Sequence, residues 1–340
     1  MQQKPNLDML RSIAVLLVLL DHVLLAAGHM QLDTPPGSWP VRSIGFFGVY
    51  IFFIHTSLVL MWSLERRPHT LEFYVRRIFR IYPLAVVAIL LVVVFRLPFS
   101  MDPTNMYATY RTTAYGLLSN LLLVQNIAHG GGYVLVVLWT LCLEVDMYIL
   151  LPFLFFYVRR NFVLWPLLVA WALACGLGLH ELGDDHVFAT VVPCFLPGVM
   201  AYVLYARVQP KLPAWLLPVF VAAVFAGYMR FHIIVAAWPA CLVMGLGLPY
   251  FRQLSFAPLL RLTHELAKYS YSVYLSHIFA LGISFYILHL HPVALQIALG
   301  LALTAIFSFA GYHLVEAPMI RLGSRIAARW ENVGEAPAAA

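Results

Sequence analysis

The chain has 340 residues, of which 62% are hydrophobic and only 11% are charged. Soluble domains carry roughly a quarter charged residues, so this composition excludes an ordinary soluble protein. The net charge of +6 does not indicate a nucleic-acid partner, because the basic residues are scattered in short segments between apolar runs. The four cysteines lie within apolar runs without metal-ligand spacing, so we expect free thiols and no metal site.

Apolar runs of about 17 to 23 residues recur along the chain, and each is long enough to cross roughly 30 Å of hydrocarbon. The stretch 114–126 is too short to cross and contains Asn120, so we predict a re-entrant or interfacial helix there. Residues 1–334 are predicted to form one membrane domain and residues 335–340 a short disordered tail. The fold class is an all-α polytopic bundle with ten spans, at residues 11–29, 43–63, 82–98, 136–157, 161–179, 187–206, 213–229, 232–249, 269–289 and 293–314.

The distribution of positive charge orients this bundle. With the N-terminus inside, the predicted cytoplasmic segments hold all but four of the 21 lysines and arginines. Cytoplasmic loops of membrane proteins are enriched in these residues, and a full crossing by residues 114–126 would destroy the bias. We therefore predict that both termini are cytoplasmic. The four exceptions are Arg42, Arg96, Arg111 and Arg230.

The first predicted span carries two ionisable residues eleven positions apart, Arg11 and His22. At about 100° per residue they share nearly one helix face and lie roughly 16 Å apart along the axis. This places Arg11 at the cytoplasmic rim and His22 near the middle of the membrane, where a polar residue is expensive and usually functional. An arginine at the rim suits a nucleotide phosphate, while a thioester on a pantetheine arm reaches the imidazole. Alternatively, Arg11 is a topology anchor and His22 an interhelical hydrogen-bonding residue.

The loop expected after the second span contains the basic run RRIFRIYP at residues 76–83. Arg77 and Arg80 fall on one helical face, and guanidinium groups suit phosphate oxygens. Basic residues in such a segment also arise from topology alone.

The fourth span contains two carboxylates, Glu144 and Asp146, close to Trp139 and Tyr148. Residues two apart point to different sides of a helix, so only one of the acids faces a given cavity. A pairing of Glu144 with His22 would raise the basicity of the imidazole and fix its tautomer. The structural alternative is a carboxylate that cross-links helices.

Two further polar clusters lie within predicted spans and suit either helix packing or a wet cavity for a hydroxyl-rich acceptor. One is His55-Thr56-Ser57 in the second span, and the other is the run YSYSVYLSH at 269–277 in the ninth. We take as acceptor or cavity-lining candidates His55, Thr56, Trp139, Asp146, Tyr148, Tyr271, Tyr274 and His277.

Several of these segments, taken in order, resemble the acyltransferase-3 family over essentially the whole chain. The resemblance departs from the family pattern at Thr56-Ser57, where Ser-Gly is usual, and at Val145 and Asp146, which replace the second acid and the polar residue after it. These departures affect the acceptor pocket more than the chemistry at His22. The matching segments are LDMLR at 7–11 with His22, GVYIFF at 48–53, RRIFRIYP at 76–83, WTLCLE at 139–144 with Tyr148 and Pro152, YSYSVYL at 269–275 with His277, and EAP at 316–318.

The resemblance implies a multi-pass enzyme of the bacterial cytoplasmic membrane that transfers an acyl group, usually acetyl, from cytoplasmic acyl-CoA. The acceptor is a hydroxyl of a carbohydrate or lipid-linked glycan. By motif, Arg11 and His22 match the essential arginine–histidine pair, Arg77 and Arg80 the basic motif, and Glu144 the first acid of the tryptophan-led motif. The catalytic pair is then His22 and Glu144, with acyl-CoA bound by Arg11, Arg77 and Arg80.

Other functions remain open for this sequence. A transporter or export protein for an acyl group or glycan would also bury polar residues along a pathway, but paired broken helices are not evident. A scaffold for polysaccharide assembly and an acyltransferase that acts on a small secreted metabolite are further alternatives. The expected partners are acyl-CoA, the glycan acceptor, the lipid bilayer and, as an option, a second copy of the chain.

Overall fold

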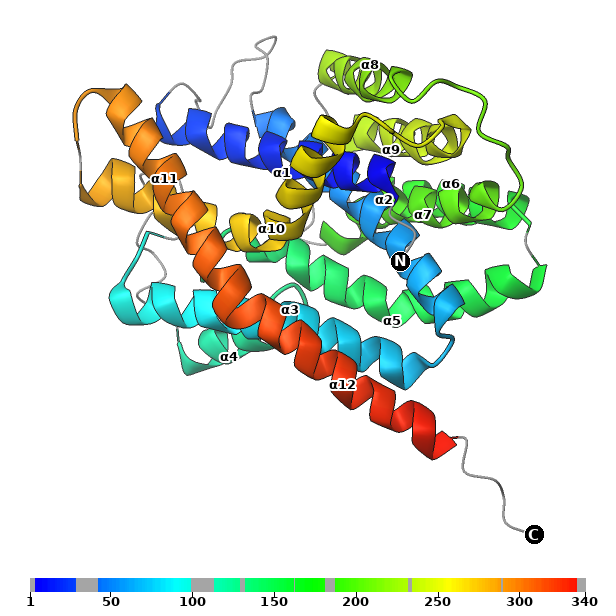
Figure 1. Cartoon of the computed structure of the whole chain (residues 1–340), viewed down its shortest axis with the longest axis horizontal. Helices are drawn as coiled ribbons and strands as arrows, with labels where there is room; N and C mark the ends of the chain where they lie inside the picture. The colour runs from blue at the N-terminus through cyan, green and yellow to red at the C-terminus, as the bar shows by residue number, and fades with distance from the viewer. Residues whose placement is uncertain are drawn as a thin grey trace. The chain divides into compact units, whose positions relative to one another are not determined.

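A computed structural model of the chain describes residues 4–28, 42–98, 113–128, 132–161, 163–180, 187–231, 234–288 and 290–334. This part of the chain is helical, and its only β contact is an isolated bridge between Leu212 and Phe251. The predicted tail at 335–340 lies outside the described residues. The α-helices in Figure 1 are α1 (Pro5–Ala26), α2 (Arg42–Arg66), α3 (Thr70–Phe95), α4 (Ala114–Leu122), α5 (Leu138–Asn161), α6 (Trp165–His180), α7 (Val187–Tyr205), α8 (Leu216–Phe231), α9 (Ala237–Gly247), α10 (Ala257–Gly282), α11 (Val293–Gly311) and α12 (Ala317–Gly334).

The all-helical membrane architecture predicted from the composition is confirmed. Within the described residues, seven helices are long and apolar enough to cross a membrane: α1, α2, α3, α5, α7, the helix 257–287 that contains α10, and the helix 293–329 that contains α11. The other three predicted spans coincide with the shorter apolar helices Trp165–His180, Leu216–Phe231 and Ala237–Tyr250. The number of crossings and the side on which each terminus lies stay predictions.

Two helices extend well beyond the predicted spans. α3 begins at Thr70, so the basic run at 76–83 is part of a helix and not of a loop as expected. The last span, predicted to end at residue 314, continues through a π-helical turn (Tyr312–Glu316) into α12. The predicted bounds follow hydropathy, which marks only where an apolar run ends. The helix itself continues as long as its polar residues find partners or solvent.

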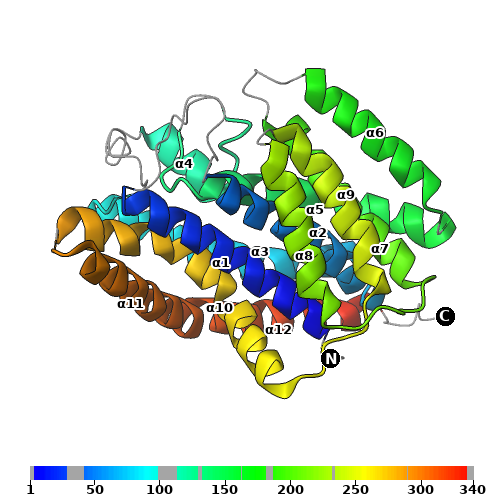
Figure 2. The same cartoon turned by 90° about the horizontal axis from the view of Figure 1, so that it is seen from above.

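The chain divides into two compact units. Unit 1 combines residues 1–62 with 149–270, and unit 2 combines residues 63–148 with 271–340. In unit 1, α7 packs against α6 and α9, and α8 lies beside α9, as Figures 1 and 2 both show. In unit 2, α12 packs along α3, and α4 also contacts α3.

Small residues allow the helices of unit 1 to approach closely. A Cβ added to Gly48 of α2 would lie 2.6 Å from the carbonyl oxygen of Ala14 in α1, and one added to Gly245 of α9 would lie 2.6 Å from Pro197 Cβ in α7. The rings of Phe53 and Phe195 stack with centroids 4.2 Å apart. Helix association in lipid depends on such close packing, because the lipid tails are as apolar as the side chains and no hydrophobic effect drives the helices together.

Candidate active site

His22 lies on α1, one of the seven candidate membrane-spanning helices, and its ring is bound to its own helix. The Nδ1 atom is 2.9 Å from the carbonyl oxygen of Val18, four residues earlier. A carbonyl oxygen only accepts, so Nδ1 carries the proton in this contact. The neutral ring therefore has its lone pair on Nε2, which is the atom able to act as a base or nucleophile.

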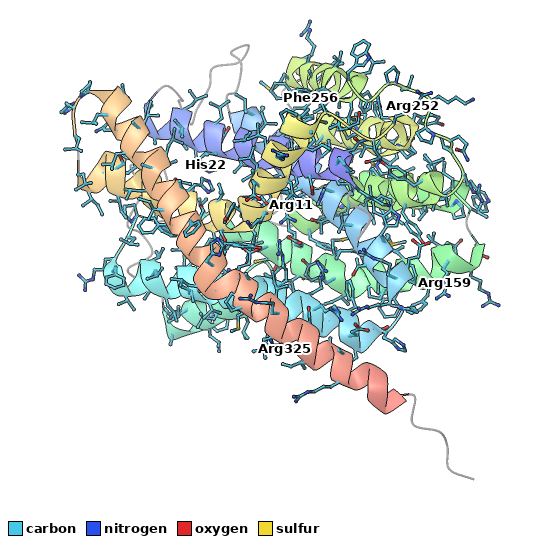
Figure 3. All side chains as sticks on the ribbon, viewed as in Figure 1. Arg11, His22, Arg159, Arg252, Phe256 and Arg325 are labelled. Atoms are coloured by element: carbon cyan, nitrogen blue, oxygen red, sulfur yellow. The ribbon has the colours of Figure 1, made fainter. Side chains whose placement is uncertain are left out.

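Arg11 shares α1 with His22, and both side chains are labelled on this helix in Figure 3. No proline or glycine lies between them, so the two residues keep regular helical spacing on nearly one face of α1. The Nε–H of Arg11 donates to Oγ of Ser270, 2.5 Å away in α10. Ser270 is fully buried and donates its own proton to the carbonyl of Ala267 at 2.7 Å, so its oxygen is oriented to accept from the guanidinium.

Contacts with α2 fix the part of α1 that carries His22. The N–H of Gly45 donates to Oδ1 of Asp21 at 3.0 Å, and Asp21 is buried. Gly48 approaches Ala14 and Val18, the residue whose carbonyl orients His22. α2 therefore holds α1 in place on both sides of the turn that precedes the histidine.

Two predicted cavity residues, His55 and Thr56, lie further along α2 in unit 1. His55 is buried and Thr56 half-buried. The next residue, Ser57, donates to the carbonyl of Phe195 at 2.8 Å and so links α2 to α7. Ser57, which together with Thr56 replaces the expected Ser-Gly pair, thus has a packing contact.

In unit 2 the arginines of α3 have separate partners. Arg76 binds the buried carboxylate of Glu72 with Nη2 and Oε1 2.5 Å apart, and its Nη1 donates to Ser324 of α12 at 3.2 Å. Arg80 Nη1 lies 2.9 Å from Oε1 of Glu316, whose side chain is completely buried. The other oxygen of Glu316 accepts from Ser272 of α10 at 2.7 Å.

Arg77 belongs to a different cluster, formed with α5. It is hydrogen-bonded to Tyr148 and attracted by the charge of Glu144. The hydroxyl of Tyr148 donates to Oε1 of Glu144 at 2.5 Å, and the two residues are one helical turn apart on α5. The buried Nε of Arg77 has no hydrogen-bond partner among the described residues. Of the three arginines in the basic run, Arg77 therefore retains an unsatisfied donor.

Asp146 faces away from this cluster, as the spacing of two residues predicted. It accepts a hydrogen bond from the side-chain amide of Asn126, in the turn after α4. One turn earlier on α5, Sγ of Cys142 contacts Oε1 of Gln125 at 2.7 Å. Trp139, Cys142 and Asp146 follow one another at helical spacing on the same face of α5.

The short helix α4 is fixed by Asn120, whose side chain is fully hydrogen-bonded. Its amide donates to the carbonyls of Gly116 and Gly132 at 2.8 and 2.9 Å, and its oxygen accepts from the N–H of Val134 at 2.8 Å. These bonds satisfy irregular backbone within the protein, which is the condition for non-helical chain at membrane depth. They also position the turn that carries Asn126.

The predicted residues of α10 are buried in unit 2. Tyr271 donates to the carbonyl of Ile81 at 2.6 Å, and Tyr274 lies 2.6 Å from the hydroxyl of Thr140. The ring of His277 lies 6.0 Å from that of Tyr274, and its Nδ1 is 3.0 Å from the carbonyl of Val273. Tyr271 and Tyr274 therefore bind backbone and hydroxyl groups of unit 2.

Unit 1 thus contains Arg11, His22, His55 and Thr56, and unit 2 contains the remaining predicted site residues, including Arg77, Arg80 and Glu144. The sequence indicates no role for Ser270, Asn126 and Glu316, which bind predicted site residues, or for Glu72, which binds Arg76. Of these, only Glu72 had a local signal, because it stands four residues before Arg76 on a helix. The others are distant in sequence from their partners.

The helices and the ionisable groups buried among them define an integral membrane protein built for chemistry or transport within its helical domain. The profile of the acyltransferase-3 family, described as an acyltransferase domain, matches residues 4–313, nearly the whole chain. The chain belongs to this family of membrane acyltransferases. No curated protein and no solved structure gave a match.

Proposed function

We propose that this protein is an O-acyltransferase that moves an acyl group, acetyl in the simplest case, from cytoplasmic acyl-CoA to a hydroxyl of a carbohydrate or lipid-linked glycan in the bacterial cytoplasmic membrane. The observation that carries the proposal is the contact between Nδ1 of His22 and the carbonyl oxygen of Val18. A histidine on a membrane-spanning helix, with Nδ1–H bound to Val18 and the lone pair on Nε2, is prepared to remove a proton. Membership of an acyltransferase family supplies the reaction class.

In the proposed reaction, Nε2 of His22 takes the proton of the acceptor hydroxyl as its oxygen attacks the thioester carbonyl. The C–S bond then breaks, the acyl group remains on the acceptor oxygen as an ester, and the proton passes from the imidazolium to the departing thiolate. A second route forms an acyl-histidine first and transfers the group from Nε2 to the hydroxyl. We propose that the negative charge of Glu144 supports the imidazolium in either route.

For the donor, we propose that Arg11, Arg77 and Arg80 bind the phosphates of coenzyme A. Arg11 donates through Nε to Ser270, and the planar guanidinium suits phosphate oxygens. The unsatisfied Nε of Arg77 supports the same role. Arg80 shares its charge with Glu316, so we expect it to contribute less to phosphate binding than Arg77.

For the acceptor, the Asp146 face of α5 offers the chemistry that a sugar requires. Asn126 donates to Asp146 through its amide nitrogen, and its buried Oδ1 has no partner among the described residues. The carboxylate of Asp146 and the amide oxygen of Asn126 are both hydrogen-bond acceptors, which suit the hydroxyl donors of a sugar. Trp139, two turns away on the same face, supplies an aromatic surface of the kind on which sugar rings pack.

The decisive experiment compares His22→Ala with a matched histidine variant, His264→Ala, in purified protein supplied with isotope-labelled acetyl-CoA. His264 is exposed on α10 and pairs with Asp8, outside the proposed chemistry. We expect His22→Ala to lower acyl transfer by about 10²–10⁴-fold, the usual contribution of a general base. His264→Ala should keep the wild-type rate. Full transfer by His22→Ala would disprove both routes.

The acceptor is identified by mass spectrometry of surface glycans and lipids from cells with and without the gene. A mass difference of one acyl group on a glycan supports the proposal. An acyl group found only on a small secreted molecule would identify a metabolite, and not a glycan, as the acceptor. Uptake or efflux by reconstituted protein without any acyl-CoA would instead indicate a transporter.

A further inference from the structure

The last helix of the chain is much longer than a membrane crossing requires. Residues 293–329 form one helix of 37 residues, visible as the single rod from α11 to α12 in Figure 1. At 1.5 Å per residue it measures about 55 Å, whereas the hydrocarbon core is about 30 Å thick. Roughly the last third of this rod therefore lies beyond the hydrocarbon.

The level at which the rod leaves the hydrocarbon can be located from its exposed residues. Ile306, Phe309 and Leu314 are strongly exposed, Leu314 to 75%, as side chains that face lipid tails would be. Tyr312 and His313 stack edge to face at this level, and aromatic residues concentrate at the boundary between hydrocarbon and headgroups. The polar headgroup layer therefore begins close to the start of α12.

Three arginines follow in the next turns. Arg321, Arg325 and Arg329 are spaced by four residues, so they form a row within about 80° of the helix circumference. All three are exposed, and no ion pair is found for them within the described residues. Arg325 of this row is labelled in Figure 3. We call these three residues the arginine row.

The opposite face of α12 is the one that packs on the protein. Gly323 and Ala327 are buried, and a Cβ on Gly323 would collide with Phe79 of α3. Arg76 of α3 also binds Ser324. Because α12 is anchored along α3 in this way, the arginine row is held outward at the headgroup level and is not free to turn toward the protein.

We propose that the arginine row is a binding site for anionic phospholipid headgroups. The charge is complementary, the level is that of the lipid phosphates, and guanidinium groups bind phosphate oxygens bidentately. The proposal does not depend on the acyl-transfer reaction, because none of the three residues belongs to the proposed active site.

The test uses the full-length protein in nanodiscs that contain equal amounts of phosphatidylglycerol and phosphatidylcholine, with native mass spectrometry to count each lipid that stays bound. Both lipids carry a phosphate, but only phosphatidylglycerol has net negative charge. We expect the wild-type protein to retain phosphatidylglycerol preferentially, and each Arg→Gln change in the row to reduce the preference about fivefold at low salt.

The matched control removes three exposed arginines elsewhere, in the variant R159Q/R160Q/R261Q. We expect this control, and R321K/R325K/R329K, to keep most of the preference. An unchanged preference in R321Q/R325Q/R329Q would overturn the proposal, and so would an equal loss in R159Q/R160Q/R261Q. If the triple variant does not fold, the wild-type preference is measured against salt, since screening should abolish it. A preference that is insensitive to salt would also overturn the proposal.

Discussion

At the scale of single residues, the candidate active site depends on how closely α2 approaches α1. Gly48 lies against Ala14 and Val18, and Gly45 lies against Asp21, so a side chain at either glycine would displace the segment that ends at His22. The chemistry proposed for His22 needs Nδ1 to stay on the Val18 carbonyl. Gly48 thus affects His22 indirectly, because it sets the position of the backbone turn that contains Val18.

A substitution at Gly48 tests this dependence. Alanine favours a helix over glycine by up to about 1 kcal/mol. At Gly48, however, its Cβ would lie 2.6 Å from a backbone oxygen, and such overpacking costs about 1–3 kcal/mol. We expect Gly48→Ala to lower the thermal unfolding midpoint of the detergent-purified protein and its transfer rate. The control Gly176→Ala on α6 meets no atom within 4 Å and should be neutral or stabilising. Equal midpoints for the two variants would contradict the argument.

At the scale of elements, buried ion pairs explain why α3 and α12 extend beyond the apolar runs. Glu72 neutralises Arg76 on α3, and Glu316 neutralises Arg80 from the π-helical turn before α12. Ser272 of α10 binds the second oxygen of Glu316. One carboxylate therefore connects three helices of unit 2, which makes Glu316 a structural partner of the basic run.

Removal of this carboxylate should cost far more than removal of an exposed one. Glu316→Gln leaves Arg80 without its counter-ion, and breaking a buried pair costs about 3–5 kcal/mol. Glu265, exposed and paired with Lys268 on α10, supplies the matched control Glu265→Gln, with an expected cost of at most about 1 kcal/mol. Chemical unfolding of both variants measures the difference. The double variant R80Q/E316Q should recover part of the loss, and a cost for Glu316→Gln no larger than the control would refute the role.

At the scale of the whole molecule, the topology rests on the positive-inside bias and on α4. Residues 114–122 form a helix of nine residues, too short to cross, and Asn120 fastens it to the chain that follows. The sequence predicted a helix here that is too short to cross, and its re-entrant or interfacial position stays a prediction. In the predicted topology, in which α4 does not cross, the later segments keep the sides that the arginines and lysines indicate.

Cysteine labelling with a membrane-impermeant maleimide tests this topology. In a cysteine-free background, His69→Cys and Gln209→Cys should react only after the cells are permeabilised. Arg96→Cys and Leu290→Cys should react in intact cells, because these positions fall in segments predicted to face outward. All four positions are exposed at helix ends or in connecting segments. Labelling of Gln209→Cys but not His69→Cys in intact cells would show an odd number of crossings between them.

The sequence by itself determined the membrane class, the helical fold and the family, because these follow from local runs of apolar residues and from motifs read in order. It also placed Arg11 and His22 on one helix, since their spacing depends only on helical geometry. It did not reveal that the basic run is helical, that α12 exists, or that Ser270 and Glu316 bind Arg11 and Arg80. These contacts join residues more than 200 positions apart, and only the tertiary packing of the helices decides which buried charge meets which partner.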